Sequence, residues 1–358
     1  MNEKIRNSNI ELLRILTAMG IMILHYNNTT MGRGLTLAEN YSINQMFLIL
    51  LESLFICGVN LFVLISGYFL STSNRRDLLK PIKLICEVII FNYIFYFIQV
   101  IRGIQEFSVE HFISRILPVN WYVMIYIGLY IISPYLNLLF NKLDTRRKKQ
   151  LLILSILTFC VYPTLTDMLV RYTGRRYMGL STIEFTGSGS GYTIINFVII
   201  YLIGCYIRNN NTKYKFSRLL RLMILNFILI FLWALSERLC LYSWGDVSWS
   251  YCNPLVIFEA VLIFLIFKQI NINSIVINKL AKASFTMYLI HNHFLEIIRI
   301  PKYVNRNIFI LMAHVIISVC IVYLVAFMVS FIYDFIMNHI WGVIDKRWKK
   351  YRFYDTEV

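Results

Sequence analysis

Apolar runs of membrane-spanning length recur along the chain, and short polar segments separate them. A bilayer core needs roughly 20 predominantly apolar residues per helix, with ~17 as a practical minimum. The pattern predicts an all-α, polytopic integral membrane protein with about ten transmembrane helices. The expected spans cover approximately residues 10–27, 45–70, 82–101, 119–140, 150–168, 191–207, 219–236, 253–267, 283–300 and 308–337.

The ninth expected span differs from the others because it is rich in polar side chains. Within it lie Ser284, His291, Asn292, His293 and Glu296. An ionisable residue inside a membrane costs several kcal/mol unless it is paired or faces a wet cavity. This segment is therefore the doubtful span, and its polar residues are candidates for a function.

Lys and Arg residues cluster in alternate segments between the apolar runs. Of the 35 Lys and Arg residues, 24 fall on the side of the N-terminus, ten fall on the opposite side, and Arg14 lies inside the first span. Positively charged loops tend to remain cytoplasmic. We therefore expect both termini in the cytoplasm, with short tails at about residues 1–9 and 338–358. Because no linker separates a second unit, residues 1–358 are expected to form a single transmembrane domain.

The composition excludes an ordinary soluble protein, because 58% of the residues are hydrophobic and only 15% are charged. In a soluble chain the net charge of +16 would indicate nucleic acid as a partner. Here the charges lie between apolar runs, which favours loops that face anionic lipid headgroups. The lipid bilayer is the expected partner and nucleic acid is not. The sequence does not indicate an oligomeric state.

Three ionisable side chains lie in the first expected span. Arg14 and His25 are eleven residues apart, which places them on one helix face about 16 Å apart at ~1.5 Å and ~100° per residue. Glu11 lies three residues before Arg14, close enough to pair with it. Such a face could hold an anionic ligand at one end and a proton-transfer group at the other. Alternatively, Arg14 only reaches back to the interface and His25 only ends the helix on its outer side.

These residues resemble a known family, the membrane-bound acyltransferase family 3. Arg14, ten intervening residues and His25 match the Arg-x10-His signature of that family. The end of the second span is similar to its Phe-x-x-x-Ser-Gly-Phe/Tyr pattern at Phe62, Ser66, Gly67 and Tyr68. Two basic residues, Arg75 and Arg76, follow directly, as family members have at that membrane surface.

Later segments extend the resemblance from about residue 8 to residue 337. The fourth span is similar to that of the family at Trp121, Tyr122, Tyr126, Tyr130 and Pro134. A late Ser-x-x-x-Tyr-Leu-x-His motif is matched at Ser284, Tyr288, Leu289 and His291. The chain departs from the family pattern at two places. Glu11 stands where many members have Asp, and Arg75 and Arg76 are adjacent where some members have Arg-x-x-Arg.

The resemblance implies an enzyme that O-acylates a surface saccharide. The acyl group would move from cytoplasmic acyl-CoA to a hydroxyl presented from the other side of the membrane. We expect an O-acetyltransferase that uses acetyl-CoA as its co-substrate, with succinyl and other short acyl groups left open. The expected acceptor is a saccharide of a bacterial envelope polysaccharide or a lipid-linked glycan precursor. The enzyme would be a multi-pass protein of the bacterial cytoplasmic membrane.

The expected catalytic residues are His25 and Glu11. Histidine supplies a base near neutral pH without further help, so His25 is the expected general base. Glu11 would orient Arg14 or only neutralise it. The phosphates of coenzyme A require fixed cations, and Arg14, Arg75 and Arg76 are the expected phosphate ligands. For Arg75 and Arg76 ordinary positive-inside topology is an equal alternative.

Six further motif residues are candidates for contacting the substrate or for packing between helices: Ser66, Tyr68, Trp121, Ser284, Tyr288 and His291. Ser284 and His291 are seven residues apart, so they would share a helix face with Tyr288 between them. No metal site is expected, because only His293 and Glu296 form a pair with suitable spacing. Four acids also lie within expected spans and could pair with an arginine or assist the base: Glu52, Glu87, Glu259 and Asp334.

Two functions from other classes are also compatible with the pattern. Charged residues within about ten spans also suit the translocation path of a secondary transporter or glycan exporter. A membrane receptor or scaffold without catalytic activity is the third hypothesis. The shared face of Arg14 and His25, together with the Ser66 and His291 motifs, favours the acyltransferase.

Overall fold

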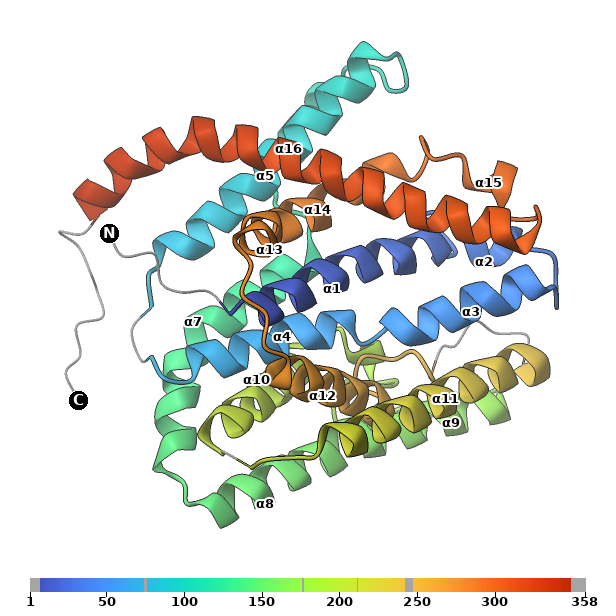
Figure 1. The fold of residues 1–358 in the computed structure, drawn as a ribbon, viewed down its shortest axis with the longest axis vertical. Coiled ribbons are helices and arrows are strands. Elements are labelled where there is room, and N and C mark those ends of the chain that lie inside the picture. The colour runs from blue at the N-terminus through green and yellow to red at the C-terminus, as the bar shows by residue number, and fades with distance from the viewer. Residues whose placement is uncertain (1–6, 74–75, 176, 211, 242–246, 349–358) are drawn as a thin grey trace.

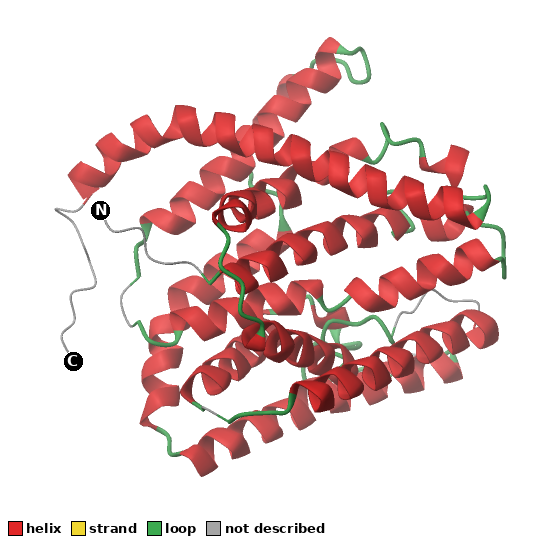
Figure 2. Ribbon diagram, viewed as in Figure 1, coloured by secondary structure: helices red, strands yellow, loops and turns green. Residues whose placement is uncertain are grey.

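The computed structural model describes residues 7–73, 76–175, 177–210, 212–241 and 247–348. These residues form helices joined by turns and loops (Figure 2), and they contain no named β-strand. The all-α prediction is therefore confirmed. The longer helices are α1 (Ser8–Asn27), α3 (Ile43–Phe55), α4 (Gly58–Leu70), α5 (Leu79–Ile101), α7 (Trp121–Lys142), α8 (Thr145–Ile156), α9 (Tyr162–Thr173), α10 (Ile194–Asn209), α11 (Phe216–Leu241), α12 (Pro254–Gln269) and α16 (Ile308–Trp348).

Short elements connect these helices. The short α-helices are α2 (Gly34–Leu37), α6 (Val109–Ser114), α13 (Ile275–Leu280), α14 (Ser284–Ile290) and α15 (Ile300–Tyr303). The π-helix η1 (Leu157–Val161) joins α8 to α9. The 3₁₀ turns are η2 (Gly189–Gly191), η3 (Ala281–Ala283) and η4 (His291–Phe294).

Seven helical segments of the described chain are long and apolar enough to cross a membrane. They are α1, α3 with α4, α5, α7, α8 through α9, α11 and α16. Two more expected spans coincide with α10 and α12, which have 16 residues each and fall just short of the ~17 residues that a span needs. The chain is thus a multi-pass membrane protein, while ten spans and two cytoplasmic termini stay predictions.

The ninth expected span is not one continuous helix. Its first part is α14, which ends at Ile290, and residues His291–Phe294 then form the 3₁₀ turn η4. Most of the polar residues of this stretch lie after the end of α14, where the α-helix gives way to the tighter 3₁₀ turn. A second difference concerns the C-terminal end, because α16 continues to Trp348 instead of ending at residue 337.

Helix α1 is the central helix of the bundle (Figure 1), and it contacts α3, α4, α12, α14 and α16. Two buried hydrophobic clusters meet on it. Leu13, Ile21 and Leu24 belong to the cluster that includes α4, α10 and α12. Ala18 and Met22 belong to the cluster that includes α3, α14 and α16. With apolar packing on two sides, only a narrow stripe of α1 is left for its polar residues.

Helices α4 and α10 pack against each other at two glycines. A Cβ atom on Gly67 would lie 2.2 Å from the backbone oxygen of Tyr201, and one on Gly204 would lie 2.4 Å from that of Leu64. Small residues allow the backbones of membrane helices to approach closely. The glycine of the Ser66-Gly67 motif therefore has a packing role.

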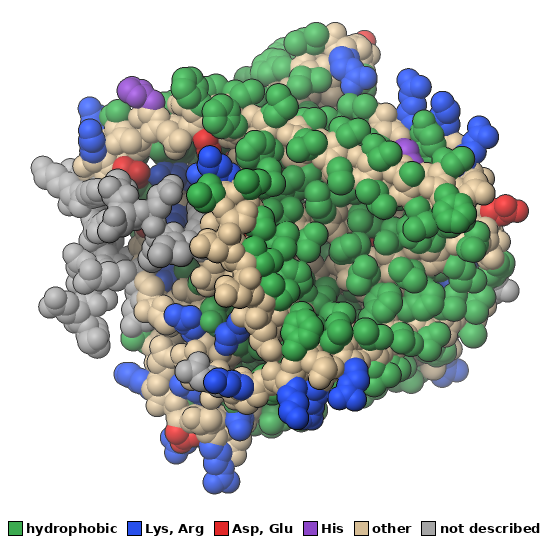
Figure 3. Space-filling model, viewed as in Figure 1, with side chains coloured by type: hydrophobic (Ala, Val, Ile, Leu, Met, Phe, Trp, Pro, Cys, Tyr) green, Lys and Arg blue, Asp and Glu red, His purple; other side chains and the backbone are tan. Residues whose placement is uncertain are grey.

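The surface is consistent with a membrane environment. On the face drawn in Figure 3, hydrophobic side chains cover the middle of the molecule, and Lys and Arg side chains gather toward its margins. The beginning of α1 and the end of α16 lie on the same side of the bundle (Figure 1). This placement agrees with the expectation that both ends of the chain face one compartment.

Candidate active site

A cavity of about 730 Å³ opens between the helices. Its wall includes Glu11, Arg14 and Ile21 of α1, which follow one side of that helix. Helices α4, α5, α7, α14 and α16 and the turn η3 complete the wall. The cavity thus follows α1 from Arg14 to Ile21, one helical turn before His25.

Four cationic side chains line this cavity: Arg14, Lys80, Lys83 and Lys282. Two acids lie among them, Glu11 and Asp334. Glu11 Oε1 lies 3.5 Å from Arg14 Nη1, as their spacing on the helix predicts. Arg14 keeps about a third of its side chain exposed (34%), so it can still contact a ligand.

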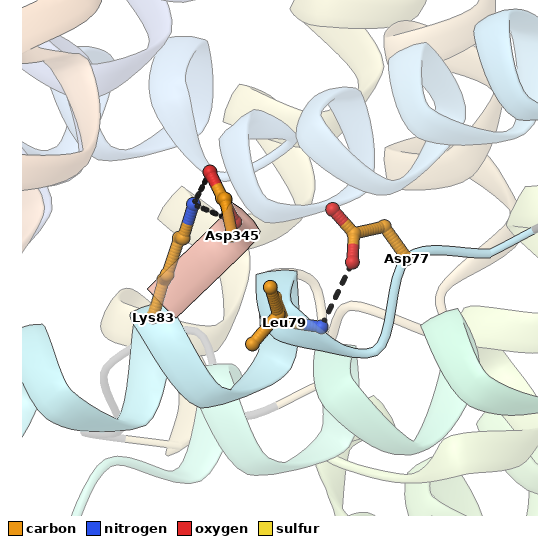
Figure 4. A network of polar contacts seen from close by, with 4 residues as sticks. All are labelled: Asp77, Leu79, Lys83 and Asp345. Carbon is orange, nitrogen blue, oxygen red and sulfur yellow. Dashed lines mark hydrogen bonds and ion pairs between the residues drawn. The ribbon is translucent and has the colours of Figure 1, made fainter. Parts of the chain in front are cut away.

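The three lysines were not singled out by the sequence. Lys80 and Lys83 only contributed to the count of cytoplasmic charges, and that count does not show which side chains face a cavity. Lys83 of α5 is held by an ion pair across the bundle, because its Nζ atom lies 3.2 Å from Asp345 Oδ2 of α16 (Figure 4). Nearby, Asp77 Oδ1 accepts a hydrogen bond from the Leu79 amide at the start of α5 (3.0 Å).

Tyrosines form one wall of the cavity. Tyr122, Tyr126 and Tyr130 are spaced four residues apart on α7, so they form one stripe. Tyr288 of α14 packs edge-on against Tyr122, with 5.3 Å between ring centroids. Its hydroxyl donates a hydrogen bond to Asn120 Oδ1 (2.9 Å), which also caps the start of α7. The tyrosine hydroxyls give this otherwise apolar wall a few polar atoms.

His25 lies one helical turn beyond Ile21, outside the cavity, and its ring contacts residues of η4. Its Nδ1 atom lies 2.7 Å from Asn292 Oδ1 and 2.5 Å from His291 Nε2. The ring of His291 lies 4.6 Å from that of His25, centroid to centroid, and 6.0 Å from that of Tyr288. His291 is 1% exposed, whereas His25 is half-buried. The cavity wall therefore leads through Tyr288 to a pair of contacting histidines, of which His25 is the more accessible.

Two expected site residues do not lie with His25. Glu11 precedes it by fourteen residues on α1, about 21 Å along the helix axis at ~1.5 Å per residue. Glu11 is therefore placed to act on Arg14 and not on His25. The other is Trp121. Its ring is tilted against that of Tyr192 before α10 (4.4 Å between centroids) and stacks on that of Tyr251 before α12 (6.0 Å).

Arg76 is not among the residues that line the cavity. Its guanidinium donates hydrogen bonds to Ser133 Oγ (2.8 Å) and to the backbone oxygens of Ser73 (2.6 Å) and Leu70 (3.2 Å). These contacts fasten the end of α4 to α7, so the geometry gives Arg76 a structural role. Arg75, the second expected ligand at this place, lies outside the described residues. Phosphate binding by this pair stays a prediction.

Three motif residues have local partners. Ser66 lines the cavity and donates a hydrogen bond to the Phe62 carbonyl (2.9 Å). Ser284 also lines the cavity, and its hydroxyl lies 3.1 Å from that of Tyr323 on α16. Tyr68 is buried and accepts a hydrogen bond from Arg208 of α10 (3.1 Å). Ser66 and Ser284 thus face the cavity, while Tyr68 packs between helices.

Three acids within the spans are held by neighbouring side chains that join pairs of helices. Glu52 of α3 accepts a hydrogen bond from Asn27 of α1 (2.9 Å). Glu259 of α12 accepts one from Asn226 of α11 (2.7 Å), and Glu87 of α5 accepts one from Thr286 of α14 (3.2 Å). Of the four acids left open by the sequence, Asp334 is the one that lines the cavity.

A family model described as an acyltransferase domain matches residues 7–334. The chain belongs to acyltransferase family 3. No curated protein and no solved structure matches the chain. The family match spans nearly the whole sequence, including α1 with Arg14 and His25 and α14 with η4.

Membership of acyltransferase family 3 identifies the protein as a membrane acyltransferase. It does not favour the transporter hypothesis. An acyltransferase must bind a donor and hold a base near the reacting carbonyl. Within the part of the chain that the structure describes, the cationic cavity and the adjoining histidine pair are candidates for these two roles.

Proposed function

We propose that this family 3 acyltransferase is an O-acyltransferase of the bacterial cytoplasmic membrane. It transfers an acetyl group from cytoplasmic acetyl-CoA to a hydroxyl of a cell-envelope saccharide or a lipid-linked glycan precursor. The observation that carries the proposal is the course of the cavity. Its cations lie near the start of α1, and its wall reaches Ile21, one helical turn before the partly exposed His25.

The cationic end of the cavity suits the phosphates of coenzyme A. Arg14 supplies a planar fork that matches phosphate oxygens, and Lys80, Lys83 and Lys282 supply further positive charge. Glu11 pairs with Arg14 and orients its guanidinium. The aromatic wall formed by Tyr122, Tyr126 and Tyr130 would accompany the pantetheine arm toward His25. Donor binding would thus use residues along the whole length of the cavity.

His25 is the proposed general base for acyl transfer. It takes the proton of the acceptor hydroxyl as the hydroxyl oxygen forms a bond to the thioester carbonyl carbon. The carbon–sulfur bond then breaks, and the departing coenzyme A thiolate takes the proton from His25. No net proton is gained or lost. The half-buried ring of His25 is accessible enough for this exchange.

The acceptor is proposed to approach from the end of α1 that carries His25. We place Trp121 and Tyr192 on its route, although Trp121 does not contact His25 directly; the two side chains remain 37% and 48% exposed. Trp121 follows Asn120, which accepts the hydrogen bond from Tyr288 beside His291. Exposed aromatic faces have an apolar body and a polar edge, which suits the apolar face of a sugar ring. This supports a saccharide as the acceptor.

The test is release of free thiol from acetyl-CoA by the purified, bilayer-reconstituted protein, with and without a membrane preparation that contains envelope glycans. We expect thiol release that rises with the glycans and label from the acetyl group in the glycan fraction. Thiol release without labelled glycan would contradict the saccharide acceptor but retain the donor. Absence of thiol release in both arms would contradict the proposed function and revive the transporter hypothesis.

A further inference from the structure

The hydrogen bond of His291 to its own helix assigns a proton to that ring. His291 Nδ1 lies 2.9 Å from the backbone oxygen of Met287. A carbonyl oxygen can only accept a hydrogen bond, so Nδ1 of His291 must carry the hydrogen. The ring is buried, and an unpaired positive charge there would cost several kcal/mol, which favours the neutral form. In the neutral form Nε2 of His291 has no hydrogen and can only accept.

This assignment determines which nitrogen of His25 carries its hydrogen. His25 Nδ1 lies 2.5 Å from His291 Nε2, and because His291 Nε2 accepts, His25 Nδ1 must donate. Asn292 Oδ1, at 2.7 Å, is a second acceptor around the same nitrogen. With its hydrogen on Nδ1, neutral His25 has a bare Nε2 atom whose lone pair can take a proton.

We propose that His291 is a positioning residue that keeps His25 in the Nδ1-protonated form, so that Nε2 is the atom that accepts the proton of the acceptor hydroxyl. The inference rests on the proposed function, in which His25 is the base. His291 itself is not placed to act as the base, because it is buried and each of its ring nitrogens has a partner. It acts only through His25.

The same contacts stabilise the intermediate state of the proposed reaction. When Nε2 has taken the proton, the ring of His25 is positively charged and its Nδ1–H becomes a stronger donor. His291 Nε2 and Asn292 Oδ1 both accept from this group, while His291 passes no proton and stays neutral. The departing thiolate then takes the proton from Nε2 and restores the starting tautomer.

A second histidine with similar bonding provides a control. His314 of α16 donates from Nε2 to the Ile298 carbonyl (2.8 Å), and its Nδ1 atom accepts from the hydroxyl of Tyr26 (3.1 Å). It thus has the same kind of carbonyl contact as His291. Its other partner is a tyrosine, and the proposed chemistry does not involve it.

The direct test is ¹⁵N spectroscopy of the full chain in a bilayer with ¹⁵N-labelled histidine, which distinguishes protonated from bare ring nitrogens. The His25 signals are assigned by their loss in His25→Asn. We expect His25 with Nδ1 protonated and Nε2 bare in the wild type. Because Asn292 Oδ1 also accepts from Nδ1, the Asn292→Ala variant is the background for the test: it should keep the wild-type tautomer, and His291→Ala in that background should give a mixture of tautomers. His25 protonated on Nε2 in the wild type, or an unchanged tautomer after His291→Ala in the Asn292→Ala background, would overturn the inference.

Kinetics on thiol release from acetyl-CoA supply the second readout. His291→Ala should lower kcat by about 10- to 100-fold, the loss that follows removal of a partner that orients a metal-ligating histidine, with little change in KM for acetyl-CoA. In His291→Gln the amide oxygen can still accept from Nδ1 of His25, so part of kcat should return. His314→Ala should keep kcat near the wild-type value.

The failure of this inference can be told apart from failure of the proposed function. Equal losses of kcat in His291→Gln, His291→Ala and His314→Ala would assign His291 a merely structural role, while His25→Asn remained inactive. If His25→Asn retained wild-type thiol release, the proposed base itself would be wrong. A rescued His291→Gln with an unchanged KM supports the positioning role.

Discussion

Lys83 of α5 and Asp345 of α16 form an ion pair at 3.2 Å beside the cationic end of the cavity. Both side chains are about a third exposed (32% and 40%), so the pair contributes little to stability. Its main effect is on the charge of the cavity, because Asp345 neutralises one of the cations that would meet an anionic donor.

Asp345→Asn should therefore strengthen binding of coenzyme A by a few-fold while changing the free energy of unfolding by less than about 1 kcal/mol. Isothermal titration with coenzyme A measures the affinity. Asp144→Asn is a matched control, since Asp144 pairs with Arg147 at 3.7 Å on α8 and is not among the cavity residues. Weaker binding in Asp345→Asn would contradict the assignment of Lys83 to the donor site.

Arg14→Ala should weaken coenzyme A binding by about 10- to 100-fold, because hydrogen bonds to charged groups contribute about 1.5–3 kcal/mol. Arg14→Lys should recover only part of this affinity, because lysine lacks the bidentate fork. The same titration gives both values, and labelling of intact membranes checks that the variants insert. An alanine variant that binds coenzyme A as tightly as the wild type would exclude Arg14 from the phosphate site.

His25→Ala should lose nearly all thiol release from acetyl-CoA, since a positioned base contributes about 10²–10⁴-fold in rate. His25→Asn should be almost as inactive, because asparagine can form a hydrogen bond but does not take a proton at neutral pH. Coenzyme A affinity, measured by titration, should change little in both variants, because the proposed phosphate ligand Arg14 lies at the other end of α1. Activity of His25→Asn within a few-fold of wild type would make His25 structural.

Gly67→Ala and Gly204→Ala should each lower stability by about 1–3 kcal/mol, the usual cost of overpacking a close contact. Gly128→Ala on α7 is the control, because the nearest atom to its added Cβ is Ile194 Cδ1 at 4.0 Å. It should be neutral or stabilise its helix by up to about 1 kcal/mol. Thermal unfolding in detergent compares the three, and equal Tm values would show that α4 and α10 can move apart.

The charge distribution predicts that the loops at 141–149 and 208–218 face the cytoplasm. These two loops lie together, because Asn209 Nδ2 donates a hydrogen bond to Asn141 Oδ1 (3.1 Å). A cysteine introduced at Asp144 should react with a membrane-impermeant thiol reagent only after the cells are opened. Labelling at this position in intact cells would contradict the proposed orientation. It would place the proposed coenzyme A site on the outer side of the membrane.

The sequence predicted α1 well, because the helix is continuous and its geometry follows directly from residue spacing. Glu11 and Arg14 pair as their separation of three residues predicts. Contacts between distant segments could not be derived in this way. Nothing in the spacing showed that His25 would meet His291 and Asn292, since 266 and 267 residues separate them.

The ninth expected span illustrates a different limit. Hydropathy measures apolar length, and it gives no information about where a polar stretch leaves the helical path. The turn at His291–Phe294 brings Asn292 to His25, a role that had no signal in the sequence beyond the presence of polar residues. Likewise, positive charge alone could not distinguish Arg76, which joins α4 to α7, from Lys83, which lines the cavity.

Because Arg14 and His25 belong to the same unbroken helix, α1 fixes the distance between them, and with it the length of a donor molecule that can contact both. The rise of the helix sets this distance at about 16 Å. In the proposed donor, the phosphates and the thioester carbonyl carbon must therefore be separated by a matching length. One residue inserted between Arg14 and His25 would turn His25 by ~100°, away from His291 and Asn292. An insertion of two whole turns, about seven residues, would restore the direction of His25 but would lengthen the distance between Arg14 and His25 by about 10 Å.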